Sequence, residues 1–359
     1  MPAGLSFLLS NTEFNARGSG VRASFGTVDQ ARDALASGAV DFVGGALGFD
    51  TDGLASLIAP EHVDFTAALR PAPTVDPMVA DMLVTPDAVH RERVVAAIAA
   101  IDAGEVEKVV IARSLDARLS APATPEELLA RFAATAGGAT IFGADLSAAP
   151  GHAGAWLIGA SPELLLRKRG ATVQCIPYAG SAPKFDAAGR PVAGAAESLR
   201  RSEKDLREHA YVVDYLRELL APLCDEIVVP DRPQTIATSH VWHLATPITG
   251  TLTDPSVTSL DLAARLSPTP AVCGTPTAAA ARIIGEIEGT RDFYAGTAGW
   301  CDASGDGEWV VSIRCLELDA SRTRVRAWAG GGIVAGSDPD AEVAETTAKF
   351  QTVLSALGG

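Results

Sequence analysis

Residues 309–329 read WVVSIRCLELDASRTRVRAWA and predict a β-hairpin. Its strands are expected over 309–318 and 323–329, where apolar and β-branched residues are frequent. Arg314 falls inside the first strand, on the same face as Val310 and Leu316. An arginine in that position either pairs with a buried acid or binds a ligand carboxylate through both ends of its guanidinium.

The segments around this hairpin continue as runs of short strands separated by a few helices. Strands are predicted over 106–112, 140–144, 155–159 and 163–168. Helices are predicted to start at residue 87 and to cover 125–134, 195–223, 260–265, 277–286 and 339–357. Consecutive strands without repeated strand–helix–strand units favour an α+β fold with large antiparallel sheets.

The first part of the chain differs in its residue pattern from the rest. Residues 1–60 mix short apolar runs with glycine pairs, which predicts strands and turns. Five prolines lie between residues 59 and 86, and this stretch is interpreted as a connector. We therefore predict a strand-rich N-terminal part of the same fold over 1–85 and a main body over 86–359.

Composition excludes several classes of protein. The 359 residues include 47% hydrophobic and 20% charged residues, enough for a substantial core, and the net charge is -15. That charge argues against binding nucleic acid or an anionic membrane surface. Five widely spaced cysteines without a CxxC pair suit buried thiols in a reducing compartment. With a start that makes a poor signal peptide, they predict a cytoplasmic protein.

Two predicted helices carry acidic residues beside their apolar stripes. Asp205 falls inside the stripe of helix 195–223 and Glu208 lies at its edge, while Glu342 and Glu345 cluster with Lys349 on one flank of helix 339–357. Two helices that each offer an i, i+3 pair of acids describe an all-oxygen site suited to Mg²⁺. The alternatives are an acid that reaches water from a helix edge and a solvated Glu–Lys pair.

Two further ionisable residues stand out by position. Lys108 opens the apolar run VVIA (109–112), so it is either a desolvated lysine able to act as a general base or a strand-end lysine that reaches water. Glu163 follows the tight Ser161-Pro162 and is either a positioned acid or only the start of a strand.

Read in order, these segments resemble the chorismate-utilising enzymes, and most closely the isochorismate synthases. The resemblance covers essentially all of residues 86–359 in the family's order. The stretches that carry it are EKVVIARS (107–114), IGASPELLLRKRG (158–170), IPYAGSAPK (176–184), SEKDLREH (202–209), HVWHLATPITG (240–250), SPTPAVCGTP (267–276), FYAGTAGWCDASGDGEWVVSIRC (293–315) and AGGGIVAGSDPDAEVAET (329–346), followed by Lys349. The resemblance implies a fold with two large antiparallel sheets that enclose the active site and helices outside.

The resemblance also implies the chemistry. It makes Lys108 the general base that activates water for attack at C2 of chorismate, and Glu163 the general acid that protonates the departing C4 hydroxyl. The net reaction is the reversible conversion of chorismate to isochorismate.

Binding roles follow from the same matches. Glu208 and Glu345 match the family's Mg²⁺ ligands, with Glu342 and Asp205 in the accompanying acidic positions. Arg314 matches the arginine that grips the enolpyruvyl carboxylate. The other residues implied to surround the substrate are Lys349, Gly180, Ser181, His243, Thr246, Tyr294 and Gly331.

Alternatives within the family stay open. Anthranilate and aminodeoxychorismate synthases, which take ammonia from an amidotransferase subunit, typically carry a lysine where Ala179 stands here, so no such partner is expected. Salicylate synthases share the lysine and the acid and also eliminate pyruvate, and Tyr294 is compatible with either activity. A non-catalytic chorismate-binding homologue is the remaining alternative. Ser267 departs from the histidine usual in that segment, and the resemblance does not separate menaquinone from siderophore synthesis.

Overall fold

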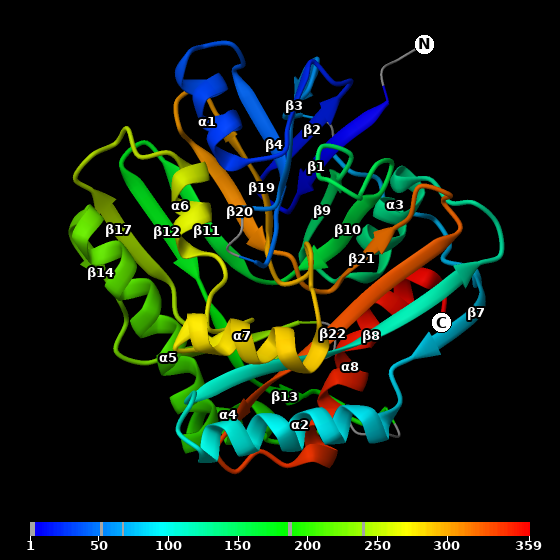
Figure 1. Ribbon diagram of the computed structural model, residues 1–359, viewed down its shortest axis with the longest axis vertical. Coiled ribbons are helices and arrows are strands. Elements are labelled where there is room, and N and C mark those ends of the chain that lie inside the picture. The colour runs from blue at the N-terminus through cyan, green and yellow to red at the C-terminus, as the bar shows by residue number, and fades with distance from the viewer. Residues whose placement is uncertain (1–3, 51–52, 67, 186–188, 239–240) are drawn as a thin grey trace.

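The computed structural model of the protein describes residues 4–50, 53–66, 68–185, 189–238 and 241–359, so His240 lies outside the described residues. The described strands form two large sheets and one small sheet, with helices around them (Figure 1). Every pairing between these strands is antiparallel, as the sequence predicted. The α+β class with two large antiparallel sheets is thus confirmed.

The larger sheet contains ten described strands, and among them β21 and β22 pair as the part of the predicted hairpin next to its turn. In spatial order they are β18 (Gly274–Thr275), β8 (Lys108–Leu119), β22 (Arg324–Val334), β21 (Cys315–Leu318), β10 (Trp156–Ser161), β9 (Thr140–Asp145), β1 (Leu5–Ser10), β2 (Asn15–Ser19) and β6 (His62–Asp64), while β7 (Val79–Val84) also pairs with β8.

The second large sheet contains nine described strands. Their order is β14 (Cys224–Val228), β17 (Ile248–Leu252), β12 (Thr172–Ile176), β11 (Leu164–Arg169), β20 (Gly307–Val311), β19 (Thr297–Asp302), β4 (Phe42–Leu47), β5 (Ala55–Ala59) and β3 (Ala23–Phe25). The small sheet consists of β13 (Tyr178–Pro183), β16 (Val241–Ala245) and β15 (Gln234–Ala237). Strands from the first 60 residues therefore contribute to both large sheets.

Helices pack on the sheets from outside. The α-helices are α1 (Val28–Ala36), α2 (Asp87–Asp102), α3 (Pro125–Thr135), α4 (Ala195–Arg201), α5 (Glu203–Leu220), α6 (Ser259–Leu266), α7 (Thr277–Glu288) and α8 (Pro339–Leu357), and a short 3₁₀ turn, η1 (Ala221–Leu223), follows α5. Helices α2 and α8 contact each other and pack on β8 and β22, while α6 packs on β11, β19 and β20 (Figure 1). None of the helices in the described ranges is long and apolar enough to cross a membrane.

Local sequence explains where several helices begin. Thr124 accepts a hydrogen bond from the Glu127 amide and Pro125 occupies the first turn, so α3 starts where the sequence predicted. Asp338 caps α8 in the same way, and Pro339 occupies the first turn of that helix. The predicted single helix over 195–223 is wrong, because the Ser202 side chain accepts from the Asp205 amide and starts α5 as a separate helix.

The predicted strand over 309–318 is also wrong, because it is two strands in different sheets. Strand β20 ends at Val311 and β21 begins at Cys315, and Arg314 between them has a φ of +52°. Such a left-handed residue breaks a strand, since neighbouring strand residues need negative φ. The predicted connector over 59–86 likewise contains two short strands, β6 and β7.

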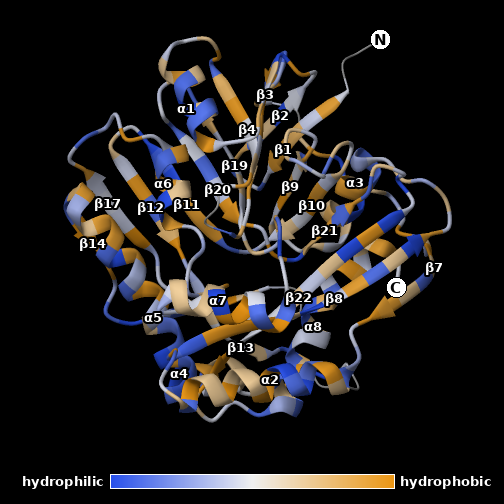
Figure 2. Cartoon of the chain, viewed as in Figure 1, coloured by the Kyte–Doolittle hydropathy of each residue, from blue (hydrophilic) through white to orange (hydrophobic). Residues whose placement is uncertain are grey.

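Alternating residues of the strands build two cores. On β1, Phe7 and Leu9 belong to a core shared with residues of the second sheet, such as Trp309. Leu8 between them faces the other side, toward a core that includes Phe132 of α3 and Phe350 of α8. This period of two is the pattern expected of a strand buried on both faces. Figure 2 shows the hydrophobic residues along the strands of both large sheets.

Candidate active site

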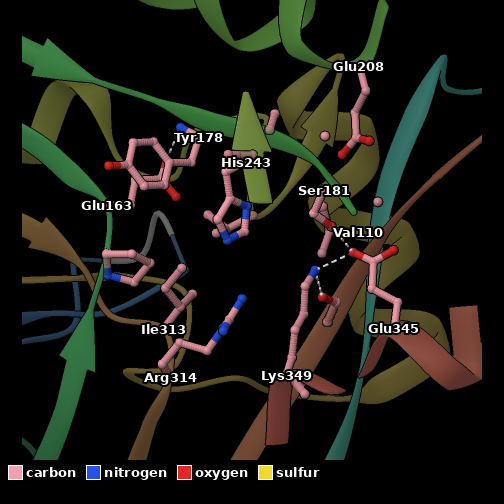
Figure 3. A pocket seen from close by; sticks show the side chains of 18 of the residues that line it. Val110, Glu163, Tyr178, Ser181, Glu208, His243, Ile313, Arg314, Glu345 and Lys349 are labelled. Atoms are coloured by element: carbon pink, nitrogen blue, oxygen red, sulfur yellow. Dashed lines mark hydrogen bonds and ion pairs between the residues drawn. The ribbon is translucent and has the colours of Figure 1, made fainter. Parts of the chain in front are cut away.

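One cavity gathers most of the residues singled out in the sequence (Figure 3). It lies among β8 and β22 of the larger sheet, the small sheet, α5 and α8. The predicted residues that line it are Glu163, Gly180, Ser181, Glu208, His243, Tyr294, Arg314, Glu345 and Lys349. Figure 3 shows Glu163 on one side of this cavity and Glu208 with Glu345 on the other.

The carboxyl group of Glu163 is buried at the short link between β10 and β11. Only 2% of the residue is exposed, and one carboxyl oxygen accepts a hydrogen bond from the Tyr178 amide at 3.4 Å. Burial raises the pKa of Glu163 to about 7, although the Tyr178 amide and the nearby Lys108 oppose the shift. A carboxyl with this pKa can both donate and accept a proton near neutral pH.

Lys108 is fully buried at the first residue of β8. Its ammonium lies 3.0 Å from a carboxylate oxygen of Glu208 on α5. This contact is an ion pair without the geometry of a hydrogen bond, and no other described group accepts a hydrogen bond from the ammonium. Lys108 itself is not among the lining residues, but through Glu208 it adjoins the cavity wall.

Two cations make the cavity suitable for an anion. Arg314 is 7% exposed, and its left-handed backbone lies between the two large sheets. Lys349 donates a hydrogen bond of 2.7 Å to the carbonyl oxygen of Gly330. Burial, together with Arg314 and Lys349, lowers the pKa of His243 to about 3, so its ring is neutral and leaves the positive charge to those two residues.

Glu345 and Glu342 on α8 pair with different lysines, and Glu342 lies 3.5 Å from the Lys204 ammonium. Glu345 lies 2.6 Å from the Lys349 ammonium and accepts a hydrogen bond of 2.9 Å from Ser181. Burial alone would raise the pKa of Glu345, but Lys349 and Ser181 lower it to about 2. Burial and the charge of Glu345 raise the pKa of Glu342 to about 7, and one of its buried oxygens has no hydrogen-bond partner.

Glycines on β22 let these carboxylates approach the strand. A Cβ at Gly332 would lie 2.3 Å from a Glu208 oxygen, and a Cβ at Gly331 would lie 2.5 Å from the unpartnered Glu342 oxygen. Any larger residue at either position would displace the carboxylate from its present place. Gly330 and Gly332 line the cavity and the predicted Gly331 does not, because alternate residues of a strand point to opposite faces.

Besides Lys108, four predicted residues stand outside the lining of the cavity: Asp205, Thr246, Gly331 and Glu342. Burial raises the pKa of Asp205, which lies in the first turn of α5 beside Gly180. Thr246 is buried behind the wall, where its hydroxyl lies 2.7 Å from a ring nitrogen of His209. Ser267 is likewise absent from the lining, although Ala271 and Val272 of the same segment are present.

Sequence reasoning missed several lining residues because they carry no charge. They are Val110, Pro162, Tyr178, Ala271, Val272, Ile313, Trp328 and Ala329, whereas the resemblance implies that Ala179 lines the pocket beside Gly180. It also missed His209, although the signal was present. His209 falls on the buried stripe of α5 with Val212 and Leu216, and a polar residue on an apolar stripe is the feature that drew attention to Asp205.

Comparisons with known proteins agree with this geometry. The family model described as chorismate binding enzyme matches residues 62–358. The MenF protein of Mycobacterium tuberculosis is 46% identical over 350 residues, which cover 94% of this chain and 92% of its own. Isochorismate synthase DhbC of Bacillus subtilis is 41% identical over 336 residues, covering 88% and 80%.

A solved structure shows the same fold. The crystal structure of DhbC from Bacillus anthracis superposes with a TM-score of 0.87 at 36% identity, covering 99% of this chain and 96% of that one. The family model and the similar chains together confirm the resemblance predicted from the motifs. The chain belongs to the chorismate-binding enzymes and, within them, to the isochorismate synthases.

Proposed function

We propose that the protein converts chorismate reversibly to isochorismate. The observation that carries the proposal is one cavity with Glu163 on one side and Glu208 on the other. Glu208 pairs with the buried Lys108 behind it. The reaction requires a base for the incoming water and an acid for the departing hydroxyl at different ring carbons. Glu163 in one wall and Lys108 behind Glu208 in the opposite wall are two buried groups that meet that requirement.

We assign the proton transfers as follows. Lys108 takes a proton from the water that attacks C2, and Glu163 gives a proton to the hydroxyl that leaves C4. The double bonds of the ring shift between these positions, so no oxidant or reductant is needed. In the reverse direction Glu163 activates water at C4 and Lys108 protonates the group that leaves C2.

Substrate binding falls to the cations of the cavity. Chorismate carries two carboxylates, and Arg314 can bind the enolpyruvyl carboxylate with two parallel hydrogen bonds. Lys349 adds a second positive charge on the side of α8. His243, Gly180, Ser181 and Tyr294 complete the contacts that we propose, while Thr246 would act from behind the wall. These cations are local exceptions in a protein whose net charge is -15.

We further propose that Glu208 and Glu345 hold a Mg²⁺ ion, with Glu342 and Asp205 as accompanying acids. The unpartnered buried oxygen of Glu342 and the glycines opposite these carboxylates support this assignment. In the described part of the chain no three potential ligands already converge, and lysines pair with Glu208, Glu345 and Glu342 instead. When bound, the ion would supply positive charge for the ring carboxylate of chorismate.

The partner and location follow from the same reasoning. Ala179, in place of the lysine expected in ammonia-using relatives, supports action without an amidotransferase subunit. All five cysteines carry free thiols, which supports a reducing cytoplasmic location.

Incubation of the purified protein with chorismate and Mg²⁺ tests the proposal. Chromatography should show isochorismate as the product, in equilibrium with chorismate, and no salicylate or pyruvate. Stoichiometric salicylate and pyruvate would make the protein a salicylate synthase. Binding of chorismate without any product would make it a non-catalytic homologue.

A further inference from the structure

A buried ion pair lies behind the wall of the cavity and takes no part in the proposed chemistry. Arg291 follows the end of α7 by three residues, and Glu288 is the last residue of that helix. Their side chains are 1% and 7% exposed, and the guanidinium donates to both carboxylate oxygens of Glu288, at 2.7 and 3.0 Å. Burying two charges costs desolvation, so such a pair is weak evidence of a role in stability alone.

The remaining donors of Arg291 bind the backbone of two cavity-lining segments. One terminal nitrogen donates to the carbonyl oxygen of Val272 at 2.8 Å, and the other to the carbonyl oxygen of Val110 at 2.8 Å. The guanidinium carbon also lies 5.6 Å from the ring centroid of Tyr294. Val110, Val272 and Tyr294 all line the cavity.

Glu288 fixes the same strand at a second point. One of its carboxylate oxygens accepts a hydrogen bond of 2.5 Å from the amide of Ala112 on β8. The strand is therefore held at the Val110 carbonyl by the guanidinium and at the Ala112 amide by the carboxylate. Lys108 precedes Val110 by two residues on β8, so its side chain points to the same face of the strand as that of Val110.

We propose that Arg291, oriented by Glu288, is a positioning residue for the reaction. It sets the spacing between β8, the 267–276 segment and Tyr294. In this way it fixes the position of the cavity wall against which the substrate lies, and the position of the strand that carries Lys108. The planar fork of an arginine can bind two carbonyls and one carboxylate together, which a lysine ammonium on a flexible stem cannot reproduce. The inference rests on the proposed function for its turnover readout.

A double variant tests the inference without leaving a charge unpaired. Arg291→Met with Glu288→Gln removes both charges and both clamps on the carbonyls, and neutral replacement of a buried pair preserves folding in general. We expect a cooperative thermal transition, a decrease in kcat of about tenfold or more, and a rise of about threefold to tenfold in the Kd for chorismate measured by calorimetry. Glu208 and Glu345 are untouched, so the affinity for Mg²⁺ should stay that of the unmodified protein.

A matched control separates this effect from the loss of any buried ion pair. Arg167 and Glu308 form a partly buried pair at 2.7 Å in the second sheet, with side chains 25% and 1% exposed, and neither residue lines the cavity. The variant Arg167→Met with Glu308→Gln should keep kcat and the Kd for chorismate, whatever its thermal stability.

Single variants keep the inference testable if the double variant does not fold. Arg291→Lys keeps a cation beside Glu288 and should still lower kcat. Glu288→Gln leaves the Arg291 guanidinium bonded to the Val272 and Val110 carbonyls, so it should lower kcat less. A folded double variant, or Arg291→Lys in its place, with kcat and Kd within about twofold of the unmodified protein would overturn the inference. If the unmodified protein binds chorismate but does not convert it, the proposed function fails, and the Kd comparison still decides the role of Arg291.

Discussion

Glu163 and Arg314 lie on two neighbouring segments that cross between the large sheets, and backbone hydrogen bonds join these segments. The Val311 amide donates to the Glu163 carbonyl at 3.1 Å, and the Ala160 amide donates to the Arg314 carbonyl at 3.1 Å. Both side chains line the cavity. These backbone hydrogen bonds hold Glu163, the proposed acid, and Arg314, the proposed carboxylate-binding cation, in fixed positions relative to each other. This favours a constant distance between them during catalysis.

Replacing Lys108 should remove catalysis while binding persists. Lys108→Gln is expected to lower kcat by about 10²–10⁴, the usual range for a lost general base, with chorismate still bound. Steady-state kinetics with chromatographic detection measures the change. Lys168→Gln is the matched control, because Lys168 is also fully buried on a strand and pairs with Asp306 at 3.2 Å away from the cavity. A near-normal kcat for Lys108→Gln would show that another group activates the water.

Replacing Glu163 should slow the reaction equally from both sides. Glu163→Gln cannot release or accept the proton, so we expect a loss of about 10²–10⁴ in kcat/KM with chorismate as substrate. The same factor must appear with isochorismate as substrate, because a catalyst does not change the equilibrium constant. Full activity of this variant in either direction would contradict the assignment of the acid.

The raised pKa of Glu163 also predicts how stability depends on pH. With a pKa of about 7 in the folded protein against 4.5 as the ordinary value, the folded state holds its proton when the unfolded state has lost it. Stability from this group is complete below about pH 4.5 and is lost as the pH rises through 7. Glu163→Gln avoids that loss. The difference in free energy of unfolding between the variant and the unmodified protein should therefore increase by about 2.5 kcal/mol from pH 5 to pH 8, in favour of the variant. Urea titrations at both pH values test this, and an equal difference at the two would refute it.

The proposed metal ligands should be separable from their acidic neighbours. Glu208→Gln or Glu345→Gln should abolish Mg²⁺-dependent activity and leave cooperative unfolding intact, because each removes a ligand and relieves carboxylate repulsion. Asp205→Asn and Glu342→Gln should be milder. Activity against Mg²⁺ concentration and calorimetric Mg²⁺ binding provide the comparison. Unchanged activity of Glu345→Gln at limiting Mg²⁺ would exclude Glu345 as a ligand.

Removing the arginine of the cavity should weaken substrate binding more than turnover. Arg314 would hold the substrate carboxylate in the ground and transition states alike, so Arg314→Ala should mainly raise KM, by about tenfold to a hundredfold. The backbone of Arg314 is left-handed, a conformation that strains every residue except glycine, so the replacement at this position can also affect the backbone. Arg314→Lys therefore provides the control, and a large loss of kcat at unchanged KM in both variants would contradict a binding role.

The amino-acid sequence by itself determined the class of the fold, the family and the charged residues that line the cavity. Charged residues beside apolar runs or stripes, such as Lys108 and Glu208, are detectable because burial of a charge needs a reason. Helix starts such as Thr124-Pro125 were readable because capping depends on a few adjacent residues.

Only the tertiary structure decided the features that depend on contacts between distant segments. The break at Arg314, which sends β20 and β21 to different sheets, lies in a run whose local pattern is that of one strand. The pairing of Lys108 with Glu208 joins residues 100 positions apart. Local patterns report which side chains are buried, but they do not report which segment lies opposite, because that depends on how sheets and helices pack as whole elements.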